Sequence, residues 1–244
     1  MLRSVKKLFE HKLGASDGEI GHVKDLYFDD RSWVVRYLVA NTGSWLSGRL
    51  VLLSPYAFGD LPQSDKVLLV NLTRQQIENS PSIESHKPVS RQYEEEYHQY
   101  YNWPFYWEGD ALWGMSGFPI LTQRAEPFQG ERATGKSGNP ESDDLHLRSV
   151  KTIVGYHLQA GAETLGHVTD FILDDQTWAI RHLVADTGHW LPDKKVLISV
   201  SQIQRISWNE SKVQVDLTKE ALLGSPAFDP ASFDIAESDQ PILK

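Results

Sequence analysis

The chain has no cysteine among its 244 residues. Disulfide bonds, thiolate metal ligands and cysteine nucleophiles are therefore excluded. No apolar run approaches the ~18 residues that a membrane-spanning helix needs, and no apolar core of a signal peptide follows the basic N-terminus. We expect a soluble, cytoplasmic protein without a transmembrane segment, for which peripheral contact with a membrane stays open.

An excess of positive charge is also missing, because the formal net charge is -9. The acid is concentrated in residues 82–146, which hold 11 acidic and 5 basic residues. Residues 2–81 (10 basic, 9 acidic) and 147–226 (8 basic, 9 acidic) are nearly neutral. Nucleic-acid binding requires a basic face that displaces counterions, so we expect no nucleic-acid partner.

The motifs of common enzyme classes are absent, including the G-x-S-x-G elbow, the H-E-x-x-H pair and the dinucleotide fingerprint. One pattern, Gly130–Ser137, fits the phosphate-binding loop G-x-x-x-x-G-K-S. That loop works between a buried strand and a helix. Here Pro127 weakens the strand and Pro140 stops the helix, so we interpret the segment as a flexible linker.

Two repeated His and Asp pairs, His22 with Asp25 and His167 with Asp170, are the best candidates for a metal site. Residues three apart on a regular strand point to opposite faces, so the two side chains of a pair do not converge. We therefore predict no metal, no cofactor and no catalytic residues, and a protein that is not an enzyme.

The chain contains an internal repeat. A shift of 145 positions aligns residues 2–81 with 147–226 without a gap, and 30 of the 80 pairs are identical. Chance does not produce such a match, so the sequence predicts two similar domains. Because the copies are nearly equivalent, we expect them to pack as a pseudo-two-fold pair, and a homo-oligomer is a further possibility.

Each copy has the pattern of a small β domain. In the first copy, residues 20–28 and 33–40 are rich in β-branched and aromatic residues, and a turn-like Asp29–Ser32 separates them. Residues 49–53 and 66–70 supply two more strands. Thr73 and Gln76 then have the spacing of a capping box that opens a short helix. The fold class is therefore all-β: two small antiparallel barrels, each followed by a short helix.

The repeated residues resemble those of the PRC-barrel, a module shared by the photosynthetic reaction-centre H subunit and the ribosome maturation factors. The resemblance covers about 160 of the 244 residues. It implies a small antiparallel barrel that docks to other macromolecules, and it implies no reaction. In the first copy the matching residues are Gly21, Val23, Asp25, Asp29, Arg36, Leu38, Val39, Thr42, Gly43, Trp45, Leu46, Val51, Leu52, Ser54, Leu72, Thr73, Ser80 and Pro81.

The predicted domains are 1–81 and 146–228, joined by an acidic linker, 82–145, and followed by an acidic tail, 229–244. Within the linker we expect a helix over about 90–101, capped by Ser90, and a mobile stretch over about 129–144. Ten aromatic residues lie between Tyr93 and Phe118. Such a density must be buried, either against the barrels or under a partner or ligand.

The most plausible function is non-catalytic protein interaction or scaffolding, including docking to a membrane-associated complex as reaction-centre H-type barrels do. The alternative is a sensor of small ligands or anions with a pocket between the barrels. Arg36 and Arg181 lie among apolar residues and need partners, for which the aspartates repeated in both copies are candidates. The candidate binding residues are Tyr97, Tyr101, Trp103, Phe105, Tyr106, Trp107, Arg36 and Arg181.

Overall fold

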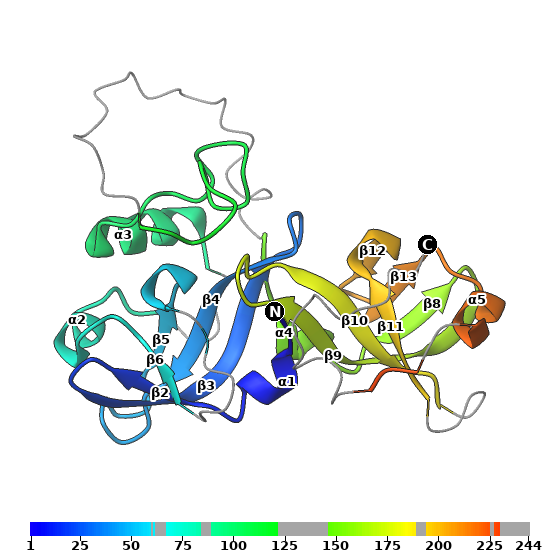
Figure 1. Cartoon of the computed structure of the whole chain (residues 1–244), viewed down its shortest axis with the longest axis horizontal. Coiled ribbons are helices and arrows are strands. Elements are labelled where there is room, and N and C mark those ends of the chain that lie inside the picture. Colours follow the sequence, from blue (N-terminus) through cyan, green and yellow to red (C-terminus); the bar gives the residue numbers. More distant parts are fainter. Residues whose placement is uncertain are drawn as a thin grey trace.

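The computed structural model describes residues 1–59, 61, 67–83, 89–121, 146–188, 194–224 and 227–229. The stretch 129–144, the pattern at 130–137 and residues 230–244 of the tail lie outside these residues. The described chain is mostly β and forms two sheets that lie side by side (Figure 1). The predicted β-rich fold is thus confirmed in outline.

The first sheet has the strand order β5-β4-β3-β2-β6, with β7 added to β3. Its longest strand, β3, pairs with β4 along the predicted hairpin, although each strand differs from the predicted range by one or two residues. The bounds are β2 (Lys12–Ala15), β3 (Gly18–Asp29), β4 (Val34–Asn41), β5 (Leu50–Leu53), β6 (Val67–Leu69) and β7 (Leu147–Ser149).

The second sheet has the order β11-β10-β9-β8-β13-β12, with β1 added to β9. Its hairpin of β9 and β10 stands in the chain where the 145-residue shift places it. Within the described residues the strand pairings form open paths rather than closed rings. The bounds are β1 (Leu2–Ser4), β8 (His157–Ala160), β9 (Glu163–Asp174), β10 (Ile180–Asp186), β11 (Lys195–Ser199), β12 (Ile203–Ser207) and β13 (Lys212–Val215).

The helices are short. Thr73 and Gln76 form the predicted capping box of α2, and the Ser90 side chain caps α3 by accepting from Tyr93 N. None of the helices in the described ranges is long and apolar enough to cross a membrane. The bounds are α1 (Val5–Leu8), η1 (Pro55–Ala57), α2 (Arg74–Glu78), α3 (Arg91–Tyr101), α4 (Val150–Ile153), η3 (Val200–Gln202) and α5 (Lys219–Gly224).

The two sheets exchange strands reciprocally. The strand β1 pairs antiparallel with β9 of the second sheet, and β7 pairs antiparallel with β3 of the first. The registers are equivalent under the 145-residue shift, since Leu2 lies opposite Asp174 and Leu147 lies opposite Asp29. The sequence reasoning did not predict β1, β7 or this exchange.

Side chains at the exchange repeat in the same way. Ser4 Oγ donates to Asp170 at 2.5 Å, and its counterpart Ser149 Oγ donates to Asp25 at 2.5 Å. Arg3 pairs with Asp175 at 2.6 Å, and Arg148 pairs with Asp30 at 2.8 Å. These contacts make the interface isologous, as in a symmetric dimer of like subunits. Asp25 and Asp170 therefore serve as acceptors across the interface.

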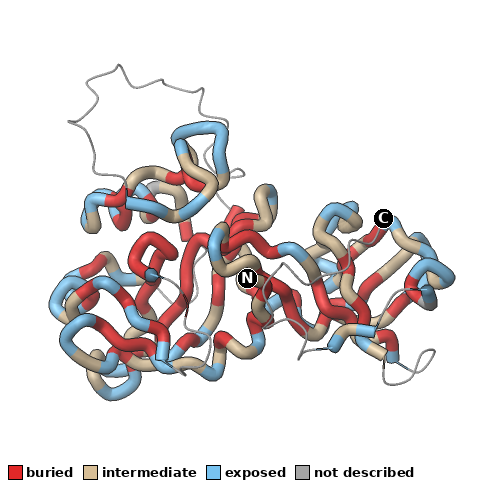
Figure 2. Tube along the Cα trace, viewed as in Figure 1, coloured by how far each residue is buried: buried red, intermediate tan, exposed pale blue. Residues whose placement is uncertain are grey.

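One hydrophobic cluster runs through both sheets and continues into α3 (Figure 2). Within this cluster the rings of Phe28 and Phe171 lie with their centroids 6.2 Å apart. Phe171 directly follows Asp170, which accepts the hydrogen bond from Ser4 across the strand exchange. The buried side chains of Tyr97 and Trp103 join the same cluster from the linker. The two sheets thus share one large core, and a smaller hydrophobic cluster of Leu2, Ile172 and Val184 is separate from it.

Candidate functional site

The helix α3 lies over β4 and β5 of the first sheet (Figure 1). Its Tyr97 is fully buried, donates its hydroxyl to Leu52 O at 2.6 Å, and meets the Tyr37 ring edge-on at 5.5 Å. Asn102 ends the helix in the left-handed conformation, with φ of 55°, which turns the chain back over α3. The predicted helix and its cap are both present.

Residues 103–113 fold back against α3 and build a layer of stacked rings. Tyr101 stacks on Trp103 at 4.4 Å, and Phe105 stacks on Trp107 at 4.8 Å. Trp113 packs on Tyr56 of the first sheet at 5.1 Å. Most of the linker's aromatic surface is therefore buried inside the protein.

A carboxylate lies beneath this layer. Glu94 is completely buried, and its Oε1 accepts from Tyr106 at 2.6 Å and from Tyr37 at 2.9 Å. Its Oε2 lies 3.0 Å from His146 Nε2 and 3.1 Å from Arg91 Nη1. Burial raises the pKa of Glu94, but the contacts with His146 and Arg91 outweigh it and hold that pKa below its ordinary value.

His98 extends the network by one step. Its Nδ1 lies 2.8 Å from Pro104 O, which can only accept, so the ring proton sits on Nδ1. Its Nε2, 3.0 Å from Tyr37 Oη, is then an acceptor and competes with Glu94 for the single Tyr37 hydroxyl proton. Burial lowers the pKa of His98 to about 4.

The depressed pKa of His98 predicts a loss of stability in mild acid. In the unfolded chain the His98 ring takes up a proton below pH 6.5, whereas in the folded chain it does so only near pH 4. Stability from this group is therefore full above pH 6.5 and is lost as the pH falls towards 4. Lowering the pH from 6.5 to 5 should cost about 2 kcal/mol of unfolding free energy.

Urea unfolding at the two pH values, compared with His98→Gln, measures this loss. The variant removes the titrating ring and should flatten the pH dependence between 6.5 and 5, whatever its stability at neutral pH. An unchanged slope in the variant would show that another group titrates.

Arg36 lies on the other side of the aromatic layer and is only 4% exposed. Its guanidinium stacks on Tyr106 at 3.9 Å, and its Nη1 donates to Leu112 O at 2.6 Å. Asp29, one of the aspartates repeated in both copies, lies 4.0 Å from Arg36 Nη2. In the second sheet Arg181 pairs with Asp174 at 3.0 Å but is 46% exposed.

The structure thus brings seven of the eight candidate binding residues into one cluster and places Arg181 apart on β10. The buried residues missed by the sequence reasoning are Tyr37, Glu94, His98 and His146. Glu94 and His98 had a usable signal, because residues four apart share a helix face. Tyr37 had none, since a hydroxyl amid apolar strand residues is read as core.

The model of the PRC-barrel domain family matches residues 148–222, which run from β7 to α5. No curated protein matches the chain.

Proposed function

We propose that the chain is a non-catalytic protein-interaction module built from two PRC-barrel domains, one of which is the domain that the family model matches over residues 148–222. The 145-residue shift places the second barrel at residues 3–77. The equivalent order of elements and the reciprocal strand exchange support this assignment. Because both halves share one core, the pair acts as a single rigid platform.

The observation that carries the docking role is an exposed apolar surface on the linker, which we call the linker surface. It follows the buried aromatic layer directly and consists of Met115, Phe118, Ile120 and Leu121, with Met115 91% exposed. Exposed apolar side chains that lie this close together are uncommon on monomeric proteins, and they often mark a protein-binding site. The loop beside α3 in Figure 2 carries this exposed stretch.

The charge near this surface favours a protein over a lipid. Glu108 and Asp110 are exposed just before it, and they repel the anionic headgroups that attract peripheral proteins. An apolar recess with a basic rim on a partner would complement both features. In line with the family resemblance, we propose a partner within a membrane-associated protein complex.

Replacing Ile120 with aspartate is expected to abolish partner capture, because a charge would then be buried in the interface. The full chain, immobilised and exposed to lysate of its native host, should retain the same proteins repeatedly, and Ile120→Asp should retain none of them. Leu69→Asp is the matched control, since Leu69 is also an exposed apolar residue but lies on β6. Equal capture by all three chains would contradict a role for the linker surface.

The alternative, a sensor of small ligands, has weaker support. In the described part of the chain, a pocket at the meeting of the sheets has a volume of about 130 Å³ and one beside α1 has about 180 Å³. Sites for drug-sized molecules typically reach 300–1,000 Å³. Arg36, proposed for such a site, is covered by Tyr106 and Trp113. The geometry therefore favours recognition of a macromolecule.

A further inference from the structure

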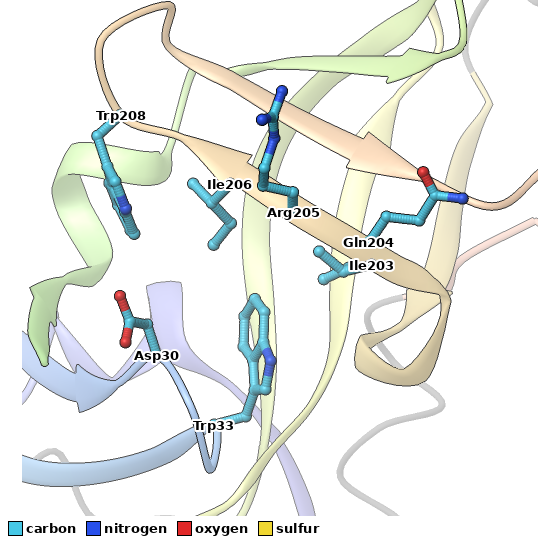
Figure 3. Close-up of a pocket in the computed structure, with 7 residues that line it drawn as sticks. All are labelled: Asp30, Trp33, Ile203, Gln204, Arg205, Ile206 and Trp208. Carbon is cyan, nitrogen blue, oxygen red and sulfur yellow. The ribbon is translucent and has the colours of Figure 1, made fainter.

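A pocket opens where the two sheets meet, which we call the inter-sheet pocket (Figure 3). One wall is the turn after β3, with Asp30 and Trp33, and the other is β12 with Trp208 beyond it. The side chains of Ile203 and Ile206 point towards Trp33, whereas those of Gln204 and Arg205 point away. The pocket volume is about 130 Å³.

The pseudo-two-fold relation supplies a counterpart for this pocket inside the same molecule. Under the 145-residue shift, Trp33, Asp30 and Ile203 correspond to Trp178, Asp175 and Phe58. At the counterpart the Phe58 ring packs on Trp178 at 5.6 Å, and Trp178 is buried. A phenyl ring thus occupies the place that the smaller Ile203 leaves unfilled.

A hydrogen-bond donor differs between the two sites as well. In both sites the Oδ2 atom of the carboxylate pairs with an arginine: Asp175 with Arg3, and Asp30 with Arg148. At Asp175 the second oxygen, Oδ1, accepts from the ammonium of Met1 at 2.7 Å. The residue equivalent to Met1 is His146, whose nitrogen is part of a peptide bond. Among the described residues, Oδ1 of Asp30 has no donor.

The walls of the pocket are held by the protein itself. Trp33 stacks on Phe28 with centroids 5.3 Å apart and has φ of 58°, a left-handed conformation that its backbone contacts maintain. Its carbonyl accepts from Ile180 N at 2.7 Å. On the opposite wall, the Arg148 guanidinium stacks on Trp208 at 4.4 Å. The two indoles are therefore positioned before any ligand arrives, which lowers the cost of binding.

The size of the pocket limits the ligand to about one ring. A cavity of about 150 Å³ suffices for benzene in a protein interior. The backbone beside the pocket favours a peptide over a free compound. β12 pairs with β13 along one edge, and within the described chain no strand pairs with its other edge. An extended chain could lie there while one side chain enters the pocket.

We propose that the inter-sheet pocket binds the aromatic ring of a tyrosine side chain, presented by an extended segment of a partner protein. The ring takes the place that Phe58 fills at the counterpart, and the tyrosine hydroxyl donates to Asp30 Oδ1 as the Met1 ammonium does to Asp175. This docking site is separate from the linker surface, and the two proposals fail independently.

The test is a titration of the full chain with N-acetyl-tyrosinamide, followed through the indole N–H resonances of Trp33 and Trp208. We expect saturating shifts at both indoles. Ile203→Phe rebuilds the counterpart's filling and should weaken binding at least about tenfold. Thermal unfolding shows that the variant is folded, and Ile120→Asp on the linker surface should bind like the original chain.

Three further probes decide the chemistry. N-acetyl-phenylalaninamide should bind more weakly because it has no donor for Asp30, N-acetyl-leucinamide should cause no shifts, and free tyrosine should bind no better than its blocked form. The proposal is overturned by an absence of shifts with the tyrosine probe, by unweakened binding to folded Ile203→Phe, or by equal binding of the leucine probe. Tighter binding of free tyrosine would point instead to a metabolite.

Discussion

Replacing Glu94 with alanine should lower the free energy of unfolding by about 3–5 kcal/mol, the range for breaking a buried ion pair from one side. The substitution removes the acceptor of two buried hydroxyls, Tyr37 and Tyr106, and leaves His146 and Arg91 without their carboxylate. Urea unfolding at pH 7 measures the effect, because one large hydrophobic cluster runs through both sheets and includes the residues around α3.

The neighbouring acid Glu95 is the matched control, since it is on the same helix but exposed. Glu95→Ala should change the unfolding free energy by no more than about 0.5 kcal/mol. Glu94→Gln should fall between the two, because it keeps an acceptor oxygen and loses the charge. Equal effects of Glu94→Ala and Glu95→Ala would show that the buried network contributes nothing to stability.

Removing the carboxylates of the strand exchange, Asp25 and Asp170, should also lower the free energy of unfolding, by a smaller amount. Asp25→Ala removes the acceptor of the Ser149 hydroxyl and of the Lys151 backbone N–H. Asp170→Ala removes the acceptor of the Ser4 hydroxyl and of the Lys6 backbone N–H. Each should cost about 1.5–3 kcal/mol, as for hydrogen bonds to charged groups. The losses should add in the double variant, because the two sites share no partner.

Asp110→Ala is the control here, since Asp110 is an exposed carboxylate in the linker. Unequal losses at Asp25 and Asp170 would mean that the two strand pairings differ in strength despite their equivalent registers. No loss at either position would show that backbone pairing alone holds β1 and β7 in place.

The buried network and the strand exchange are connected through one residue. His146 approaches Glu94 with its ring, and its carbonyl accepts from Asp30 N at 3.0 Å just before β7 begins. The packing of α3 on the first sheet therefore also positions the strand that leads into the second half.

The repeat and the composition of the sequence determined the β-rich class, the hairpins, the capped helices and the family of residues 148–222. These features depend on neighbours in the chain or on identities 145 positions apart. That Arg36 and Arg181 would each pair with a repeated aspartate was also predictable, because a mid-strand guanidinium needs a nearby acid, but the choice of Asp29 and Asp174 among those aspartates was not.

Only the tertiary structure decided that β1 joins the second sheet and that β7 joins the first. When the two copies are alike, β3 and β9 are equally good antiparallel partners for β1. It also decided that Glu94 would be buried among tyrosines from distant segments, although its neighbours in the helix sequence are hydrophilic. Long-range packing selects among local alternatives of similar energy, and a single sequence does not contain the distances that settle such a choice.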